Sequence, residues 1–263
     1  AGSIEHDWFV ETPPGRILIK QAPELERLLK FVQKRKEEGG IEFSLTHLVV
    51  KAIAKALKDT SSLNGYMIGN RFYKARNSSI ELSVCTDSTD MAAINIKDAH
   101  RKELNVIAAE MQSQSKLIRS GNREPSKSQV LLDAIPQPVM FVAVSMLKFF
   151  GLYQAICSAS TATGMGKAVC RVLSMPRSDQ GLTLDGDFAF IPHQSSILLS
   201  DMPTSITIGD VTMKTVLAED GMAKNVPVLN LSISINSNAV SLAQAKNFSI
   251  TLRRYLNTPT TDL

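Results

Sequence analysis

Residues 226 to 259 constrain the fold of this chain most, because a strand pattern runs directly into a helix pattern there. Along the strand, apolar side chains alternate strictly with polar ones: Leu229, Leu231, Ile233 and Ile235 against Asn230, Ser232, Ser234 and Asn236. A period of two with one apolar face predicts a strand that is buried on one side. Further along, the spacing of Phe248, Leu252 and Leu256 predicts a helix, which ends before Pro259.

This order of strand, short turn, helix and "YLNTP" resembles the C-terminus of the catalytic (core) domain of the 2-oxoacid dehydrogenase dihydrolipoyl acyltransferase family. That family shares its fold with chloramphenicol acetyltransferase. Residues 43–67 look like the family's long central helix, residues 98–121 like a second helix, and residues 205–211 like one of its strands. The resemblance implies an α/β fold, namely a chloramphenicol-acetyltransferase-like two-layer sandwich with a mixed sheet and helices on one side.

The family's strand runs into a His-x-x-x-Asp-Gly motif, and this motif is degenerate here. Laid on the strand, the family's His falls on Ile235, its Asp on Ala239 and its Gly on Val240. In the family, the His takes the proton from the thiol of coenzyme A or dihydrolipoamide, which requires an imidazole with a pKa near neutral. Ile235 cannot accept a proton, so no catalytic residue is expected, and coenzyme A or a lipoyl thioester is required only if the protein is active.

Other residues are candidates for positions in a substrate channel. The resemblance implies a hydroxyl that stabilises the oxyanion across a trimer interface, and Ser174 is its candidate, although the family's Ser-Asn-Leu-Gly reads Ser-Met-Pro-Arg here. Asn236 and Asn238 can form hydrogen bonds but are not bases near pH 7. For His47, early in the core helix, a structural contact is favoured over a channel role.

The remaining histidines and acidic residues give weaker signals. His193 is a further possible channel residue. It lies beside Ser195 and Ser196, but adjacent residues on one loop rarely face each other as a nucleophile and base must. His6 and His100 are interpreted as surface positions. Asp87 and Asp90 are interpreted as turn residues of a loop.

The N-terminal half predicts further elements around one core helix. "RILIK" from Arg16 is a candidate strand, and a helix opened by Pro23 follows it. Ser44 is a good N-cap for a core helix that is apolar nearly all round. Three lysines, Lys51, Lys55 and Lys58, are expected to form the single solvent-exposed edge of this helix. Strands are predicted over 71–96 and a third helix around 104–111.

A hydrophobic run covers residues 139–156, with Lys148 as its one charge. Eighteen residues span about 27 Å as a helix, just short of a bilayer core of about 30 Å. A buried or trimer-facing helix is favoured over a helix that lies on a membrane or caps an assembly. A transmembrane span is least favoured, because Gly151, Pro136 and Pro138 suit a soluble insertion better.

Composition indicates one domain over residues 1–263, with a hydrophobic insertion at about 125–175. The chain has 263 residues, 44% of them hydrophobic, which suits one large core. The net charge of +4 is spread, and aromatic residues make up only 6%, so nucleic-acid binding is not expected. Three scattered cysteines favour a reducing compartment, and no C-x-x-C or H-x-x-x-H pair suggests a metal site.

The sequence and the resemblance support two possible functions. The first is a catalytically degenerate core protein that acts as a self-assembling scaffold, since the resemblance implies homotrimers that can assemble into cages. The alternative is an active acyltransferase, dependent on coenzyme A or lipoyl thioesters, with a rebuilt site. Other complex subunits are possible partners, as is a membrane through residues 139–156. The chain begins without Met, so lipoyl or subunit-binding domains can have been removed; an intracellular location, cytoplasmic or mitochondrial matrix, is expected.

Overall fold

The computed structural model describes residues 8–12, 16–37, 44–68, 71–85, 91–119, 142, 168–174, 202–217 and 222–258. In chain order its elements are β1 (Trp8–Thr12), β2 (Arg16–Gln21), α1 (Glu26–Glu37), α2 (Leu45–Asp59), β3 (Gly65–Ile68), β4 (Arg71–Lys74), β5 (Ile80–Cys85), β6 (Met91–Ile96), α3 (Leu104–Arg119), β7 (Cys170–Ser174), β8 (Thr204–Leu217), β9 (Ala223–Asn236) and α7 (Leu242–Asn257). These bounds confirm the strands and helices predicted from periodicity.

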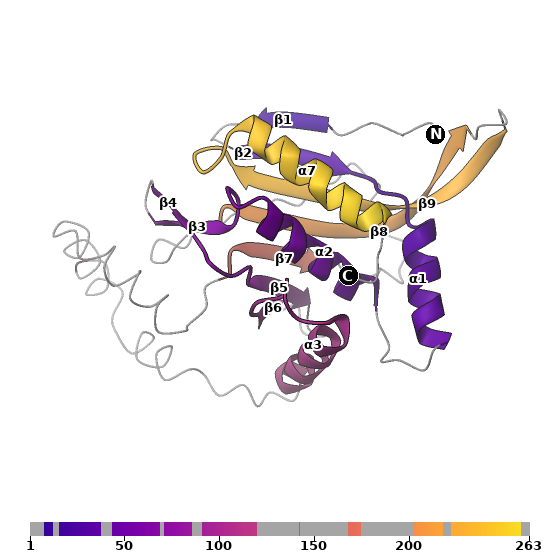
Figure 1. Cartoon of the computed structure of the whole chain (residues 1–263), viewed down its shortest axis with the longest axis horizontal. Helices are drawn as coiled ribbons and strands as arrows, with labels where there is room; N and C mark the ends of the chain where they lie inside the picture. The colour runs from indigo at the N-terminus through magenta and orange to yellow at the C-terminus, as the bar shows by residue number, and fades with distance from the viewer. Residues whose placement is uncertain are drawn as a thin grey trace.

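Seven of the described strands form one mixed sheet in the order β1-β2-β9-β8-β7-β5-β6 (Figure 1). Strand β7 is parallel to both β5 and β8, whereas the other neighbours are antiparallel. Strands β3 and β4 make a separate two-stranded sheet. The central strands therefore come from distant parts of the sequence, with β7 inserted between β5 and β8.

The strand register sorts the side chains of the sheet into an apolar face and a polar face. Two rows cross the apolar face, and their buried members are Ile17, Ile235, Thr204, Cys170, Ile80 and Ile96 in one row and Ile19, Ile233, Ile206, Val172, Leu82 and Ile94 in the next. Between them lies a row of the opposite face, which runs Leu18, Ser234, Ser205, Arg171, Glu81 and Asn95. Alternation along each strand produces this division.

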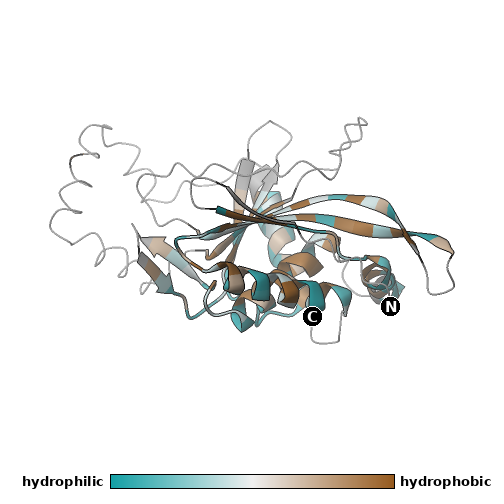
Figure 2. Cartoon of the chain, turned by 90° about the horizontal axis from the view of Figure 1, so that it is seen from above, coloured by the Kyte–Doolittle hydropathy of each residue, from teal (hydrophilic) through white to brown (hydrophobic). Residues whose placement is uncertain are grey.

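Helices α1, α2 and α7 lie on the same side of the sheet (Figure 2). Helix α2 is central: it contacts α1, α3 and α7, and ten of its fifteen residues are buried. The buried Phe248 and Leu252 of α7 join the same core. The expected two-layer α/β sandwich with a mixed sheet is confirmed.

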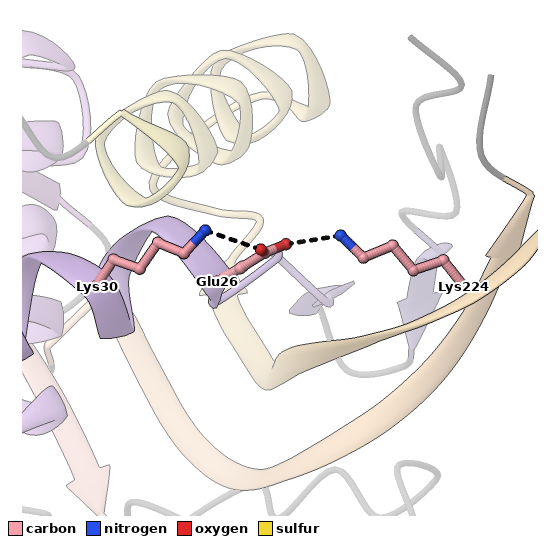
Figure 3. A network of polar contacts seen from close by, with 3 residues as sticks. All are labelled: Glu26, Lys30 and Lys224. Atoms are coloured by element: carbon pink, nitrogen blue, oxygen red, sulfur yellow. Dashed lines mark hydrogen bonds and ion pairs between the residues drawn. The ribbon is translucent and has the colours of Figure 1, made fainter. Parts of the chain in front are cut away.

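Strands β8 and β9 extend beyond the body of the sheet as a long hairpin (Figure 2), the β8–β9 arm, residues 211–217 and 223–228. A bulge between Ile208 and Val211 marks its start, and Asn230 Nδ2 bridges it by donating to Asp210 O and to Thr212 Oγ1, each at 3.1 Å. The first residue of α1 ties the arm to the helix layer, because the Glu26 carboxylate lies 3.0 Å from Lys30 Nζ and 3.3 Å from Lys224 Nζ (Figure 3). These two lysines lower the pKa of Glu26.

The predicted insertion at about 125–175 lies outside the described residues, apart from Val142 and residues 168–174. The alternatives for residues 139–156 therefore stay predictions. Within the described part of the chain, no helix has both the length and the apolar character needed to cross a membrane.

Candidate functional site

The candidate site lies where β9 ends and α7 begins, at the positions of the degenerate motif. Ile235 is the penultimate residue of β9, and its side chain is 0% exposed. It pairs with Ile17 of β2 on one side and with Thr204 of β8 on the other. The residue at this position therefore belongs to the core beneath the helix layer, and it has neither the chemistry nor the access of a general base.

The turn after Ile235 uses both candidate asparagines for its own geometry. Asn236 Oδ1 accepts a hydrogen bond from the Asn238 N–H at 2.9 Å, and Asn236 O accepts one from the Ala239 N–H at 3.0 Å. The Asn236 N–H in turn donates to Pro203 O at 2.8 Å. Side chains of this type commonly stabilise turns by bonding to a backbone two residues on. Val240 closes the turn as a buried residue.

Ser241 starts α7 as its N-cap. Its Oγ accepts a hydrogen bond from the Gln244 N–H at 3.4 Å, and Gln244 Oε1 accepts one from the Ser241 N–H at 2.9 Å. This reciprocal arrangement is a capping box. Ser241 was not predicted as a cap, although the S-x-x-Q spacing that signals such a box is present in the sequence.

The cap offers a second register for the degenerate motif. Asp is among the best N-cap residues, and the N-cap of α7 is Ser241. If the motif's Asp is laid on Ser241, its His falls on Ser237 and its Gly on Leu242. Neither register supplies an imidazole, because the sequence holds no histidine after His193.

His47, the candidate in the core helix, takes part in the start of α2. Its Nδ1 accepts a hydrogen bond from the Ser44 N–H at 2.9 Å, and Ser44 Oγ lies 2.8 Å from the same atom. The side chain is 8% exposed, and burial lowers its pKa. This geometry agrees with the structural contact that the sequence analysis favoured, and the predicted N-cap Ser44 is confirmed.

Ser174 is the last residue of β7, where it pairs with Val84 and Ile208. The residue of β7 in the row of Ile235 is Cys170, four positions earlier, which corresponds to about 13 Å along a strand. The structure does not bring Ser174 and Ile235 together within one chain. His193, His6, Asp87 and Asp90 lie outside the described residues.

Of two positions predicted to be exposed, Lys51 is buried and His100 is only partly exposed. Lys51 is only 4% exposed, and its Nζ donates to Ala99 O at 3.3 Å, to His100 O at 3.0 Å and to Lys102 O. His100 is half-buried, and both of its ring nitrogens are shielded without a hydrogen-bond partner in the described structure. The turn between β6 and α3, which contains His100, supplies the three carbonyls that bind Lys51 and so removes Lys51 from the exposed edge predicted for α2.

Metal ligands were not expected from the sequence. Among the described residues, no group of three His, Cys, Asp or Glu side chains is placed to hold a metal ion.

Residues 17–129 match the family model of the 2-oxoacid dehydrogenases acyltransferase (catalytic domain). Solved structures extend the likeness over most of the chain. The dihydrolipoamide acetyltransferase of Azotobacter vinelandii is 17% identical with a TM-score of 0.65, covering 94% of this chain and 83% of that one. A probable dihydrolipoamide acetyltransferase from Listeria monocytogenes is 16% identical with a TM-score of 0.62, covering 94% and 86%.

The chain has the fold of a 2-oxoacid dehydrogenase acyltransferase catalytic domain. Chloramphenicol acetyltransferase shares this fold more distantly, at 12% identity and a TM-score of 0.51, covering 94% of this chain and 90% of that one. No curated protein matches the sequence. The resemblance stated from the sequence is therefore confirmed for the acyltransferase-like fold. The matched residues 17–129 do not include the β9–α7 junction, where the family's motif would lie.

Proposed function

We propose that this protein is a catalytically degenerate, acyltransferase-like core protein that acts as a self-assembling scaffold, as a trimer or a larger cage. The observation that carries this proposal is the complete burial of Ile235 at the end of β9. General-base catalysis of thiol transfer needs an imidazole or an equivalent base beside the substrate. An isoleucine sealed in the core cannot be that base, and the scaffold requires neither coenzyme A nor a lipoyl group.

The surroundings of Ile235 support the same conclusion. The Asn236 side chain accepts a hydrogen bond from the Asn238 backbone N–H, and Ser241 caps α7, so these two side chains, Asn236 and Ser241, serve the local fold. His47 is turned to the backbone of Ser44. None of these described side chains forms the base–orienter pair that an activated thiol transfer requires.

The assembly part of the proposal has two supports. Similar structures include the cubic core of the pyruvate dehydrogenase multienzyme complex and a catalytic core of the 2-oxoacid dehydrogenase multienzyme complex from Thermoplasma acidophilum. In this chain, the β8–β9 arm carries apolar side chains into solvent, with Met213 64% exposed and Val211 beside it on the same strand face. Isolated exposed apolar residues are common, but a projecting hairpin of this kind is suited to contact between subunits.

An active acyltransferase is the alternative, and the match of residues 17–129 to an acyltransferase family favours it. Fold likeness alone is weak support for activity, because function depends on the site. The alternative requires a different catalytic base. His47 is engaged as a helix cap, so His193 is the remaining candidate.

Acetyl transfer from acetyl-CoA to dihydrolipoamide, followed as loss of thioester, separates the two proposals. The Azotobacter vinelandii enzyme serves as positive control in the same assay. A rate at the uncatalysed background is expected from the scaffold. A saturable rate that His193→Ala abolishes would establish the alternative and overturn the degenerate assignment.

Sedimentation velocity or mass photometry tests assembly separately. The scaffold is expected as a trimer of the 28.7 kDa chain or a multiple of a trimer at micromolar concentration. A monomer over the whole concentration range would contradict the assembly part of the proposal, even if the acetyl-transfer rate is at background.

A further inference from the structure

Ser44 and His47 close the first turn of α2 through a contact that only the neutral imidazole can make. The Ser44 N–H lies 2.9 Å from His47 Nδ1, and Ser44 Oγ lies 2.8 Å from the same nitrogen. A backbone amide can only donate a hydrogen bond, so Nδ1 must be the acceptor. The proton of the neutral ring is therefore on Nε2.

The residue type at this position makes the cap unusual. The first N–H groups of a helix have no partner within the helix, and in a capping box Glu or Gln at the third helical position usually reaches back to the N-cap N–H. Here His47 holds that position. An imidazole differs from these residues because its ordinary pKa lies near 6.5, within the range of mildly acid conditions.

The cap stands at the start of the central helix. Leu48, Val49 and Val50 follow His47 directly and are fully buried in the core. A change in the first turn of α2 therefore acts on residues that contact the sheet and the neighbouring helices, rather than on an exposed helix end.

No charged neighbour in the described structure holds His47 in its charged form. Burial is the cause that lowers the pKa of His47. Lys51, one turn further along α2, is engaged by three carbonyls of the turn between β6 and α3. Three charged groups on the neighbouring helices are paired with other side chains: Arg254 of α7 with Asp59, Glu110 of α3 with Lys102, and Lys30 of α1 with Glu26.

We propose that the Ser44–His47 cap is a pH-sensitive switch that opens the first turn of α2 in mildly acid conditions. Protonation converts His47 Nδ1 from an acceptor into a donor. Two N–H donors, those of Nδ1 and of the Ser44 backbone, then face each other and repel. This inference is independent of the scaffold function, because it concerns α2 whether or not the protein assembles or transfers acyl groups.

The direction of the effect follows from linkage. Burial lowers the pKa of His47 in the closed state below its ordinary value of 6.5, so the open state binds the proton more readily. The stabilisation by the closed cap is complete above about pH 6.5 and is lost as the pH falls through the lower pKa of the closed state.

Hydrogen exchange of the full chain tests the switch, with mass spectrometry of peptides that cover residues 44–50 and of reference peptides from α7. After correction for intrinsic exchange, protection at 44–50 is expected to be lost as the pH falls from 7 to 5, while protection of α7 stays unchanged. His47→Gln keeps an acceptor without a titration in this range, so its protection is expected to be independent of pH. His100→Gln is the matched control and is expected to retain the wild-type response.

Three results would overturn the proposal: a flat wild-type profile, an unchanged response in His47→Gln, or a response that disappears in His100→Gln. Long-range ¹H–¹⁵N spectra at pH 7.5 give a readout that needs no variant. They are expected to show the proton of His47 on Nε2, and a proton on Nδ1 would contradict the cap.

Discussion

Ile235 of β9 and Ile17 of β2 are direct partners in the antiparallel ladder, and both side chains are buried under the helix layer. The same row continues through Thr204 and Cys170 to Ile80. The position to which the motif's histidine was assigned is therefore part of the continuous core that joins the N-terminal strand to the C-terminal half of the chain.

Ile235→Ala is expected to lower the free energy of unfolding by about 2–5 kcal/mol, because it leaves a cavity between β2, β8 and the helices. Urea unfolding measures the loss. Ile250→Ala, at a site 53% exposed on α7, is the control and is expected to change stability by less than about 0.5 kcal/mol. Equal losses in the two variants would show that Ile235 is not in the core.

Lys51→Met is expected to destabilise the fold by about 1–3 kcal/mol at pH 7, because three carbonyls of the turn from Ala99 to Lys102, one of them buried, lose their donor. Urea unfolding again measures the difference. Lys58→Met, at an exposed position two turns further along α2 with one hydrogen bond to Arg76 O, is the control and is expected to have a much smaller effect.

The pH dependence of the Lys51 effect has a defined sign. Burial, with a smaller contribution from Lys55, lowers the pKa of Lys51 from 10.5 to about 8. Between these values the unfolded chain binds the proton and the folded chain does not, so the stability that Lys51 contributes rises with pH. The difference in free energy of unfolding between wild type and Lys51→Met is therefore expected to increase from pH 8 towards pH 10. A decrease in this difference over the same range would contradict the lowered pKa of Lys51.

Ser241→Ala is expected to cost about 0.5–2 kcal/mol, since the Gln244 N–H loses its acceptor and the first turn of α7 loses its cap. Ser241→Gly is expected to cost only a few tenths of a kcal/mol, because glycine is also tolerated at an N-cap. Thermal unfolding of the two variants side by side provides the measurement. A larger loss for glycine than for alanine would argue against a capping role.

Met213→Glu is expected to lower the mass of the assembly, because it places a charge on the exposed apolar face of the β8–β9 arm. Lys214→Glu is the matched control on the opposite face of the same strand, since successive side chains of a strand alternate. Sedimentation velocity measures both. An unchanged mass in Met213→Glu, or an equal loss in both variants, would exclude this face of the arm as the subunit contact.

Much of the architecture was predictable, because it depends on short-range periodicity. The alternation from Leu229 to Ile235 predicted β9, and the apolar spacing after Ser44 predicted α2 with its cap. The resemblance then supplied the two-layer arrangement that strand patterns alone do not specify. The strand register of β7 between β5 and β8 was not predictable, because β7 pairs with β5 across about 90 residues of sequence and joins it to β8.

For the candidate site as well, some features follow from the sequence and others only from the tertiary structure. The sequence by itself determined that neither register of the motif holds a histidine, since that is a matter of residue identity. Only the tertiary structure decided that Ile235 is buried in the core, that His47 caps α2, and that Lys51 is buried where an exposed edge of α2 was predicted. The partners of Lys51 are carbonyls about 50 residues away. Periodicity along one helix cannot reveal them, because burial is set by what the rest of the chain places against that helix.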